Sequence, residues 1–342
     1  MNECSVLIEP LVLGGVRIRN RLFAAPMSGI SDDPFRRRAF DHGAGLVVTE
    51  MVASGELARD RRDTALRVKR SGISPHMVQL AGRNPHWMAE AARIAEGEGA
   101  DLIDINMGCP AKKVTGGLSG SALMREPELA LSLIDAVIDA VGVPVTVKMR
   151  LGWDETAFVA PVLARRAEQA GVAMVTIHGR TRCQFYKGKA DWQAIRRVKE
   201  VVSIPVVANG DVRDTADALE IIDASGADAV MIGRAGQGAP WAAGEIAREL
   251  GSKSGSPPPA SGEAMADYIV AHHQDMLAFY GVESGLRQAR KHLGWYFDRM
   301  GGRVDTGLRH RAMTSLDPNT VHATIREIAR QASDATEFRT AA

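Results

Sequence analysis

The sequence predicts an α/β fold: a (β/α)8 TIM barrel followed by a small C-terminal all-helical bundle. Three observations support this prediction. Eight short apolar runs recur before residue 250, helix-length segments separate most of them, and no convincing strand pattern follows. The chain has 342 residues, and such barrels typically take about 250, which leaves room for a second, smaller domain. A doubly wound open sheet is the weaker alternative.

The eight runs are continuously apolar rather than alternating, as expected of parallel strands that are covered on both faces. They lie at residues 22–27, 46–51, 77–81, 102–106, 143–150, 174–178, 206–209 and 229–232. Segments with helical spacing lie between them, among others at 85–98, 128–141, 158–170 and 215–224. Gly99, Gly171 and Gly226 each precede a predicted strand and indicate helix C-caps.

Residues 251–262 are rich in Ser, Pro and Gly and indicate a linker that follows a barrel of residues 1–250. Helical patterns follow at 265–280, 282–300 and 319–332, so residues 263–342 predict a small helical domain with a flexible C-terminal end. Between residues 284 and 311, seven Lys and Arg stand against two Asp, a local charge of +5. This stretch predicts a polyanion contact, although a solvated basic helix face explains the composition equally well.

The composition is that of a soluble globular protein, with 45% hydrophobic and 24% charged residues. The sequence contains no export signal and no apolar run of about 18 residues, so it predicts a cytoplasmic protein without membrane insertion. Three cysteines without framework spacing agree with a reducing compartment. No nucleotide-binding glycine motif or metal-ligand spacing is found, and no stable protein partner is implied.

Cys109 lies in the turn Gly108-Cys109-Pro110, directly after a predicted strand. Because Gly and Pro shape the chain on both sides, the thiol would be held in one place, as an acid or a nucleophile requires. Cys4 and Cys183 lack such surroundings. The alternative is a buried, inert cysteine that packs as a small hydrophobe.

The predicted strand ends are unusually polar, and in this fold the functional groups lie at the C-terminal ends of the strands. His178 alone is more commonly a core histidine, and Lys148 alone is as often a salt-bridge partner. The complete set favours a site, and it consists of Ala25, Pro26, Met27, Gln79, Asn106, Cys109, Lys148, Arg150, His178, Arg180, Asn209, Gly210, Asp211, Gly233 and Arg234.

Glycine turns at Gly210 and Gly233, with Arg234 beside the second, follow the last two strands, where barrels of this kind bind phosphate. Flavin mononucleotide (FMN) fits such a site best. Lys148 would place a cation beside the pyrimidine edge of the flavin, and Gln79 would offer a donor and an acceptor to the same ring. The turn at residues 25–27 would support the ring.

Several ordered motifs resemble those of the tRNA-dihydrouridine synthases. They are residues 25–32, 34–36, 106–110, 178–182, 209–211 and 233–234. Lys112-Lys113-Val114, Tyr280-Gly281 and Ala289-Arg290-Lys291-His292 are most similar to the bacterial B-type members. The similarity extends from about residue 11 to about residue 313, although residues 115–118 match less well.

The resemblance implies an FMN barrel with a helical tRNA-binding domain that reduces uridine in tRNA to 5,6-dihydrouridine at the expense of NADPH. Cys109 would be the proton donor, and Asn106 and Arg150 would face the uracil. FMN would be bound by Ala25, Pro26, Met27, Gln79, Lys148, Asn209, Gly210, Asp211, Gly233 and Arg234, with His178 close by. Because the base must leave the folded tRNA to react, we expect phosphate contacts from Arg180, Arg182, Lys187, Lys189, Arg287, Arg290 and Lys291.

Two rival functions remain at this point. An FMN barrel reductase of a small molecule, such as a dihydroorotate or dihydropyrimidine dehydrogenase-like enzyme, would need the flavin residues without the basic helical tail. A non-enzymatic RNA-binding regulator would not need Cys109 together with Lys148, and we consider it the less favoured alternative.

Overall fold

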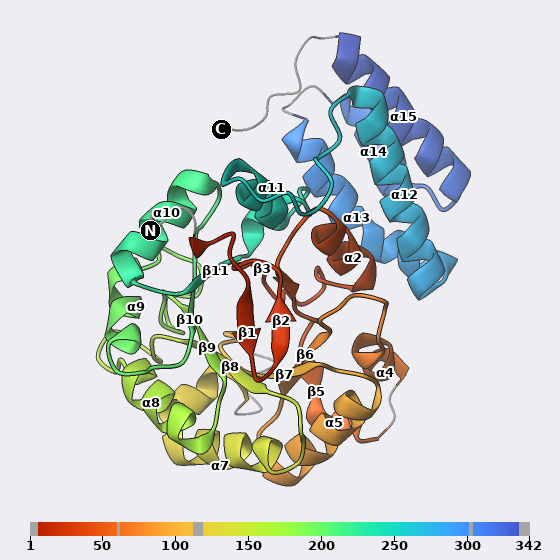
Figure 1. The fold of residues 1–342 in the computed structure, drawn as a ribbon. Coiled ribbons are helices and arrows are strands. Elements are labelled where there is room, and N and C mark those ends of the chain that lie inside the picture. Colours follow the sequence, from red (N-terminus) through yellow and green to blue (C-terminus); the bar gives the residue numbers. More distant parts are fainter. Residues whose placement is uncertain (1–5, 60–61, 112–118, 301–303, 335–342) are drawn as a thin grey trace.

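Eight parallel strands close into a barrel in the computed structural model of the chain, which describes residues 6–59, 62–111, 119–300 and 304–334 (Figure 1). The strands are β3 (Leu22–Ala24), β4 (Leu46–Val47), β6 (Met77–Ala81), β7 (Leu102–Met107), β8 (Val145–Arg150), β9 (Met174–His178), β10 (Val206–Asn209) and β11 (Ala229–Ile232). They pair in the order β4-β3-β11-β10-β9-β8-β7-β6, and a bridge from Val48 to Met77 closes the ring. The predicted barrel is therefore confirmed.

Two predicted strands end earlier than expected. The first stops at Ala24 because Pro26, which lacks an N–H group, cannot continue the ladder. The second, predicted over residues 46–51, is interrupted after Val47, and a separate two-residue strand, β5 (Val52–Ala53), pairs with β6 instead. The chain is thus free to form turns at both strand ends.

A short antiparallel hairpin fills the amino end of the barrel and was not predicted. It consists of β1 (Leu11–Leu13) and β2 (Val16–Ile18), which lie across the barrel axis in Figure 1. Its apolar side chains join one buried cluster with the residues inside the barrel, Phe23, Leu46, Met77, Leu102, Met174, Val207, Ala229 and Met231. The carboxyl end of the strands is left open.

Helices surround the barrel (Figure 1). They are α2 (Asp33–Asp41), α3 (Ser54–Leu57), α4 (Arg62–Val68), α5 (Pro85–Gly97), α7 (Pro127–Ile138), α8 (Ala160–Ala170), α9 (Trp192–Lys199), α10 (Thr215–Ser225) and α11 (Ala242–Glu249), with short 3-10 turns η1 (Gly120–Arg125) and η2 (Arg234–Gly236). The side chains of Asp32, Asn84, Asp191 and Asp214 cap four of the helices. Gly171 and Gly226 take the left-handed conformation of a C-cap.

The C-terminal part is a bundle of α12 (Gly262–Tyr280), α13 (Val282–Arg299), α14 (Thr306–Thr314) and α15 (Pro318–Asp334), as the predicted fold requires. It packs on α2 and α11 of the barrel, where Tyr268 lies against the rings of His42 and Trp241. The division into domains, with its linker and its flexible end, stays a prediction, and residues 335–342 lie outside the described residues. Among the described helices, none combines the length and apolarity needed to cross a bilayer.

Candidate active site

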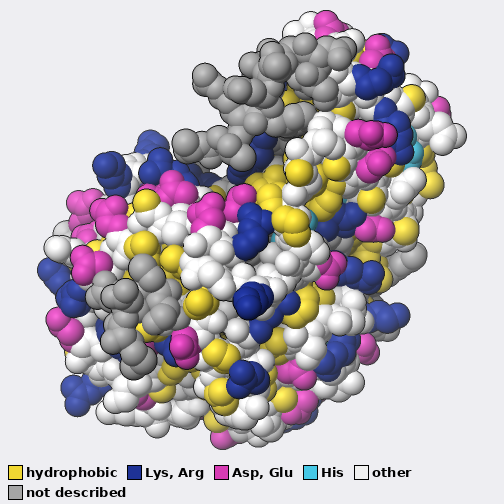
Figure 2. Space-filling model, turned by 45° about the horizontal axis from the view of Figure 1, so that its top comes forward, with side chains coloured by type: hydrophobic (Ala, Val, Ile, Leu, Met, Phe, Trp, Pro, Cys, Tyr) yellow, Lys and Arg dark blue, Asp and Glu magenta, His cyan; other side chains and the backbone are white. Residues whose placement is uncertain are grey.

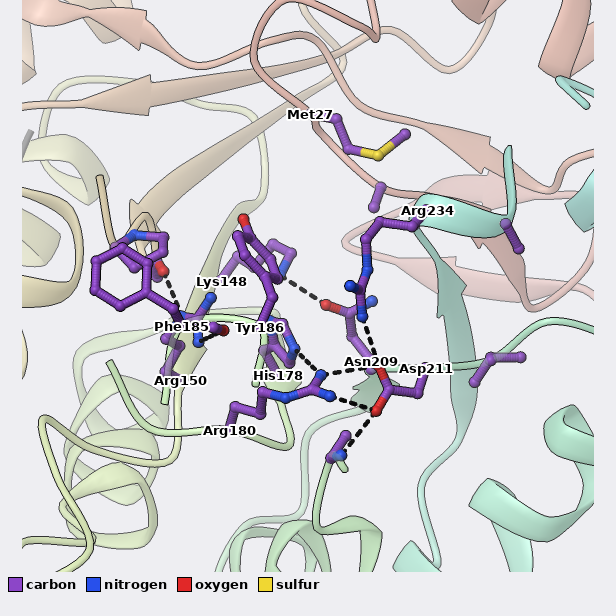
Figure 3. Close-up of a pocket in the computed structure, with 18 of the residues that line it drawn as sticks. Met27, Lys148, Arg150, His178, Arg180, Phe185, Tyr186, Asn209, Asp211 and Arg234 are labelled. Atoms are coloured by element: carbon purple, nitrogen blue, oxygen red, sulfur yellow. Dashed lines mark hydrogen bonds and ion pairs between the residues drawn. The ribbon is translucent and has the colours of Figure 1, made fainter. Parts of the chain in front are cut away.

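A cleft of about 1440 Å³ lies at the carboxyl end of the strands. Pockets for one small ligand usually have about 300–1,000 Å³, so this cleft has room for a cofactor and a second group. Figure 3 shows side chains from several strand ends that point into it. Predicted residues that line the cleft are Ala25, Pro26, Met27, Gln79, Asn106, Cys109, Lys148, Arg150, His178, Arg180, Asn209, Gly210, Asp211, Gly233 and Arg234.

The turn that holds Cys109 is fixed from both sides. Asn106 Oδ1 accepts hydrogen bonds from the backbone N–H groups of Gly108 (3.1 Å) and Cys109 (3.0 Å). The carbonyl oxygen of Cys109 accepts two more from Ser121, one from the hydroxyl (2.8 Å) and one from the N–H (3.1 Å). The half-buried thiol therefore has a defined place at the cleft. Residues 112–118, which include the Lys112-Lys113-Val114 motif, lie outside the described residues.

Asp104, which sequence reasoning missed, anchors a chain of buried amides. It is 2% exposed and accepts hydrogen bonds from Gln79 Nε2 (2.7 Å) and Thr146 Oγ1 (2.6 Å). Gln79 Oε1 in turn accepts one from Asn106 Nδ2 (2.8 Å). Burial raises the pKa of Asp104 to about 6, against the hydrogen bonds from Gln79 and Thr146. A carboxylate only accepts hydrogen bonds, so ionised Asp104 requires the Gln79 amide nitrogen to face it. The Gln79 oxygen then faces Asn106 Nδ2, and this leaves Asn106 Oδ1 directed toward the Cys109 turn.

Lys148 is the cation at the floor of the cleft. Its Nζ donates to Asn209 Oδ1 (3.1 Å), and Asn209 Nδ2 donates to the carbonyl oxygen of Met231 (2.8 Å). Desolvation, together with repulsion from Arg150, lowers the pKa of Lys148 to about 8. A cation that is costly to keep charged without a partner is suited to bind an anionic group.

His178 is neutral at physiological pH. Desolvation holds the pKa of His178 well below 6.5, and repulsion from Lys148 and Arg150 acts in the same direction. Its Nε2 lies 3.4 Å from Arg180 Nη1. A guanidinium only donates, so Nε2 accepts and the ring proton lies on Nδ1.

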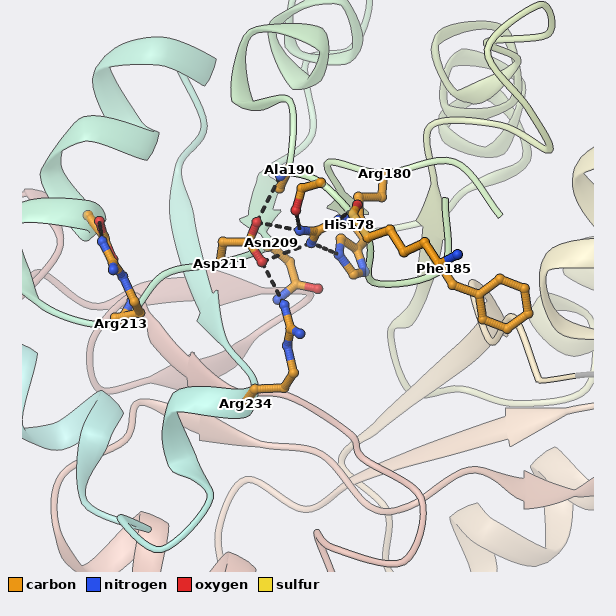
Figure 4. Close-up of polar contacts among 12 residues, drawn as sticks. His178, Arg180, Phe185, Ala190, Asn209, Asp211, Arg213 and Arg234 are labelled. Atoms are coloured by element: carbon orange, nitrogen blue, oxygen red, sulfur yellow. Dashed lines mark hydrogen bonds and ion pairs between the residues drawn. The ribbon is translucent and has the colours of Figure 1, made fainter. Parts of the chain in front are cut away.

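Asp211 organises the loop that follows β10 (Figure 4). It accepts two hydrogen bonds from Arg180 (2.8 and 2.6 Å), one from the N–H of Ala190 (2.8 Å) and one from Arg234 (2.7 Å). Burial raises the pKa of Asp211, but the bonds from Arg180 and Ala190 outweigh it, and the net shift is downward. The preceding Gly210 has φ +132°, and a Cβ there would lie 2.7 Å from the Ala190 Cβ.

The structure changes the interpretation of two arginines. Arg180 is 1% exposed, and besides Asp211 it binds the carbonyl oxygens of Lys187 and Gly188 (3.1 and 2.6 Å). A phosphate contact would require it to release Asp211, so we no longer assign Arg180 to the tRNA surface. Arg150 donates to the carbonyl oxygens of Gly108, Thr181 and Phe185 (2.8–2.9 Å). It thereby ties the Cys109 turn to the loop after β9.

Tyr186 was also missed, because nothing in the sequence separates it from other loop aromatics. It is 52% exposed and lines the cleft. The centroid of its ring lies 5.5 Å from the guanidinium carbon of Arg150 and 5.2 Å from that of Arg234. Arg182, by contrast, does not line the cleft and stacks on Trp153 (4.7 Å).

Among the described tail cations, several pair with carboxylates instead of forming a simple basic patch, and Arg303 lies outside the described residues. Arg287 pairs with Glu283 and Arg311 with Glu327. Both carboxylates lie outside residues 284–311, so they offset part of the +5 charge counted there, whereas Asp298, the partner of Arg309, is already included in that count. Lys291 is half-buried beside Gly29, and desolvation lowers the pKa of Lys291. Figure 2 shows basic side chains dispersed among apolar and acidic ones on the face that it displays.

Comparisons with known proteins identify the family. The family model described as dihydrouridine synthase (Dus) matches residues 23–333. A probable tRNA-dihydrouridine synthase of Rhizobium leguminosarum bv. phaseoli is 58% identical over 306 residues, 90% of this chain and 94% of the relative. The tRNA-dihydrouridine synthase B of Escherichia coli (strain K12) is 46% identical over 287 residues, 83% of this chain and 88% of the relative.

Solved structures support the fold. A 2-naphthoyl-CoA reductase superposes with a TM-score of 0.58 at 11% identity, over 72% of this chain and 52% of the reductase. TcOYE superposes with a TM-score of 0.54 at 14% identity, over 73% of this chain and 94% of TcOYE. Since the family match spans both the barrel and the bundle, the chain belongs to the dihydrouridine synthase family, as the resemblance of its motifs predicted.

Proposed function

We propose that this dihydrouridine synthase binds FMN and uses NADPH to reduce the 5,6 double bond of uridines in the tRNA D-loop. One observation supports the proposal above all. The fixed Cys109 turn, the desolvated Lys148 and the two glycine turns with Arg234 all line one cleft. The chain has the acid, the cation and the phosphate-binding turns that the reaction needs.

The residues at the cleft fit FMN. Gly210 has no room for a Cβ, and with Gly233 and the half-exposed Arg234 it offers an anion site at the end of the last two strands. Ala25, Pro26 and Met27 provide an apolar support for a flat ring. Gln79, Lys148 and Asn209 provide polar groups for its edge, with His178 and Asp211 completing the wall. When bound, FMN supplies the hydride.

The chain's own residues perform the remaining tasks. Cys109 donates a proton from its thiol to one carbon of the uracil 5,6 double bond, the carbon next to the one that would receive the hydride. Asn106 and Arg150 keep its turn in place, and both line the cleft where the uracil would lie. Lys148 keeps a positive charge beside the flavin ring, because a nearby anion favours its protonated form.

The proposal extends to the partners. We expect tRNA to contact Arg182, Lys187, Lys189, Arg287, Arg290 and Lys291, through phosphates that these cations would neutralise. NADPH would be the reductant, and the reaction would take place in the cytoplasm.

The test is dihydrouridine formation on tRNA that lacks the modification, with FMN and NADPH supplied and products identified by mass spectrometry after nuclease digestion. We expect conversion by the wild type and none by Cys109→Ala. A wild type that binds FMN and is reduced by NADPH, yet converts only small activated alkenes, would favour the small-molecule reductase.

A further inference from the structure

Helix α13 of the bundle contacts two of the loops that border the cleft. In Figure 1 it lies on the barrel side of the bundle, next to α2 and α11. Toward the loop after β3, the Lys291 amine lies 3.6 Å from where a Cβ on Gly29 would be. Toward the loop after β11, Arg299 and the backbone around Trp295 meet residues 235–238. These loops also contain five of the residues that we assign to FMN, namely Ala25, Pro26, Met27, Gly233 and Arg234.

Arg299, at the end of α13, holds the turn after β11 directly. Its Nε donates to the carbonyl oxygen of Gln237 (2.9 Å), and its Nη2 donates to that of Ala235 (2.6 Å). Both carbonyls belong to the turn that begins at Gly233 and Arg234. Hydrogen bonds from a charged donor are stronger than those between neutral groups, and the planar guanidinium fixes the spacing of its two acceptors.

Gly238 brings the same turn against the helix backbone. It has φ +67°, and a Cβ there would lie 2.6 Å from the carbonyl oxygen of Trp295 and 3.0 Å from the nitrogen of Tyr296. Only a residue without a side chain allows this approach, so any substitution would push the turn and α13 apart.

The turn is supported from the barrel side by a residue that also touches α13. The Phe35 ring of α2 lies 3.3 Å from where a Cβ on Gly236 would be, and 6.1 Å between centroids from the ring of His292 on α13. The turn therefore lies between α2 and α13. Its shape depends on both.

We propose that α13 is a part of the cofactor site, because Arg299 and the close approach at Gly238 hold residues 233–238 in the shape that receives the phosphate of FMN. The inference rests on the flavin proposed above. Arg299 acts through the turn and is a positioning residue. The helical part then serves two purposes, contact with tRNA and retention of the cofactor, and a ligand that displaces α13 would also change the affinity for FMN.

The test is to titrate FMN into the full-length apoprotein and to measure binding by the quenching of flavin fluorescence. For Arg299→Ala we expect the Kd for FMN to rise about tenfold or more, since tenfold corresponds to about 1.4 kcal/mol, the scale of one net hydrogen bond. Arg299→Lys keeps the charge but cannot span both carbonyls, so it should fall between the wild type and Arg299→Ala. Gly238→Ala should weaken FMN binding without any change of charge.

Two control variants separate this effect from general damage. Arg326→Ala removes an exposed arginine of α15 that pairs with Asp267, and Gly15→Ala strains a glycine of φ +88° with nothing within 4 Å of its Cβ position. Both should bind FMN as the wild type does. Melting curves of the apoproteins show whether each variant is folded.

Wild-type affinity in both Arg299→Ala and Gly238→Ala would overturn the inference and leave the proposed function intact. A wild type that fails to bind FMN would instead contradict the proposed function, and this inference with it.

Discussion

Replacing Lys148 by methionine should stabilise the apoprotein while weakening its hold on the cofactor. Surrounding protein desolvates the ammonium group, and the pKa of Lys148 falls from 10.5 to about 8. The folded state therefore bears a free-energy cost for keeping this side chain charged at pH 7. Methionine has a similar length and no charge, so it removes the cost.

The magnitude follows from the shift. The pKa of Lys148 is lowered by about 2.5, and each pKa unit is worth about 1.36 kcal/mol. The charged side chain therefore lowers the free energy of unfolding at pH 7 by roughly 3 kcal/mol. The variant also loses the hydrogen bond from Nζ to Asn209 Oδ1 (3.1 Å), which contributes about 1 kcal/mol. We expect a net stabilisation of about 2 kcal/mol at pH 7.

The sign can be checked by varying the pH. Between the folded pKa of about 8 and the unfolded value of 10.5, the unfolded state binds more protons, so the wild type gains stability as the pH rises. The advantage of Lys148→Met should therefore shrink from pH 7 to pH 10. Urea unfolding of both apoproteins at the two pH values measures it, and a variant that is less stable at pH 7, or a difference independent of pH, would refute the reasoning.

Three further predictions concern the acid, the RNA surface and the Asp211 loop. Cys109→Ala should retain bound FMN and its reduction by NADPH while losing dihydrouridine formation, and equal loss of flavin, seen in the absorbance spectrum, would show that the residue holds the cofactor instead. Asp211→Ala should destabilise the protein by about 3 kcal/mol because it leaves the buried Arg180 without its carboxylate, and a thermal midpoint equal to that of the wild type would contradict this. Substitution of three tail cations by Ala should weaken tRNA binding. The slope of log K for tRNA binding against log salt concentration should fall in magnitude by roughly 0.7–0.9 per lost phosphate contact, and unchanged binding would exclude these cations from the RNA surface. These cations are Arg287, Arg290 and Lys291.

Much of the fold was predictable because buried parallel strands and capped helices have local signals. The hairpin at residues 11–18 was missed because three-residue strands are too short to show a period. The residues that line the cleft could be predicted from the strand ends alone, whereas the residues with which they form hydrogen bonds and ion pairs could not. Arg180 appears in the sequence as a free cation, since its carboxylate partner lies 31 residues away. Asp104 did offer a signal, a carboxylate inside an otherwise apolar strand.

The hairpin that fills the amino end of the barrel also bears on the order in which the two substrates would bind. With that end packed by side chains such as Leu13 and Ile18, the cleft opens at the carboxyl end of the strands. Under the proposed function, NADPH and the tRNA base would both approach the flavin through this opening. Each would have to leave before the other could enter, so the enzyme would work in two half-reactions and hold its electrons on the cofactor between them.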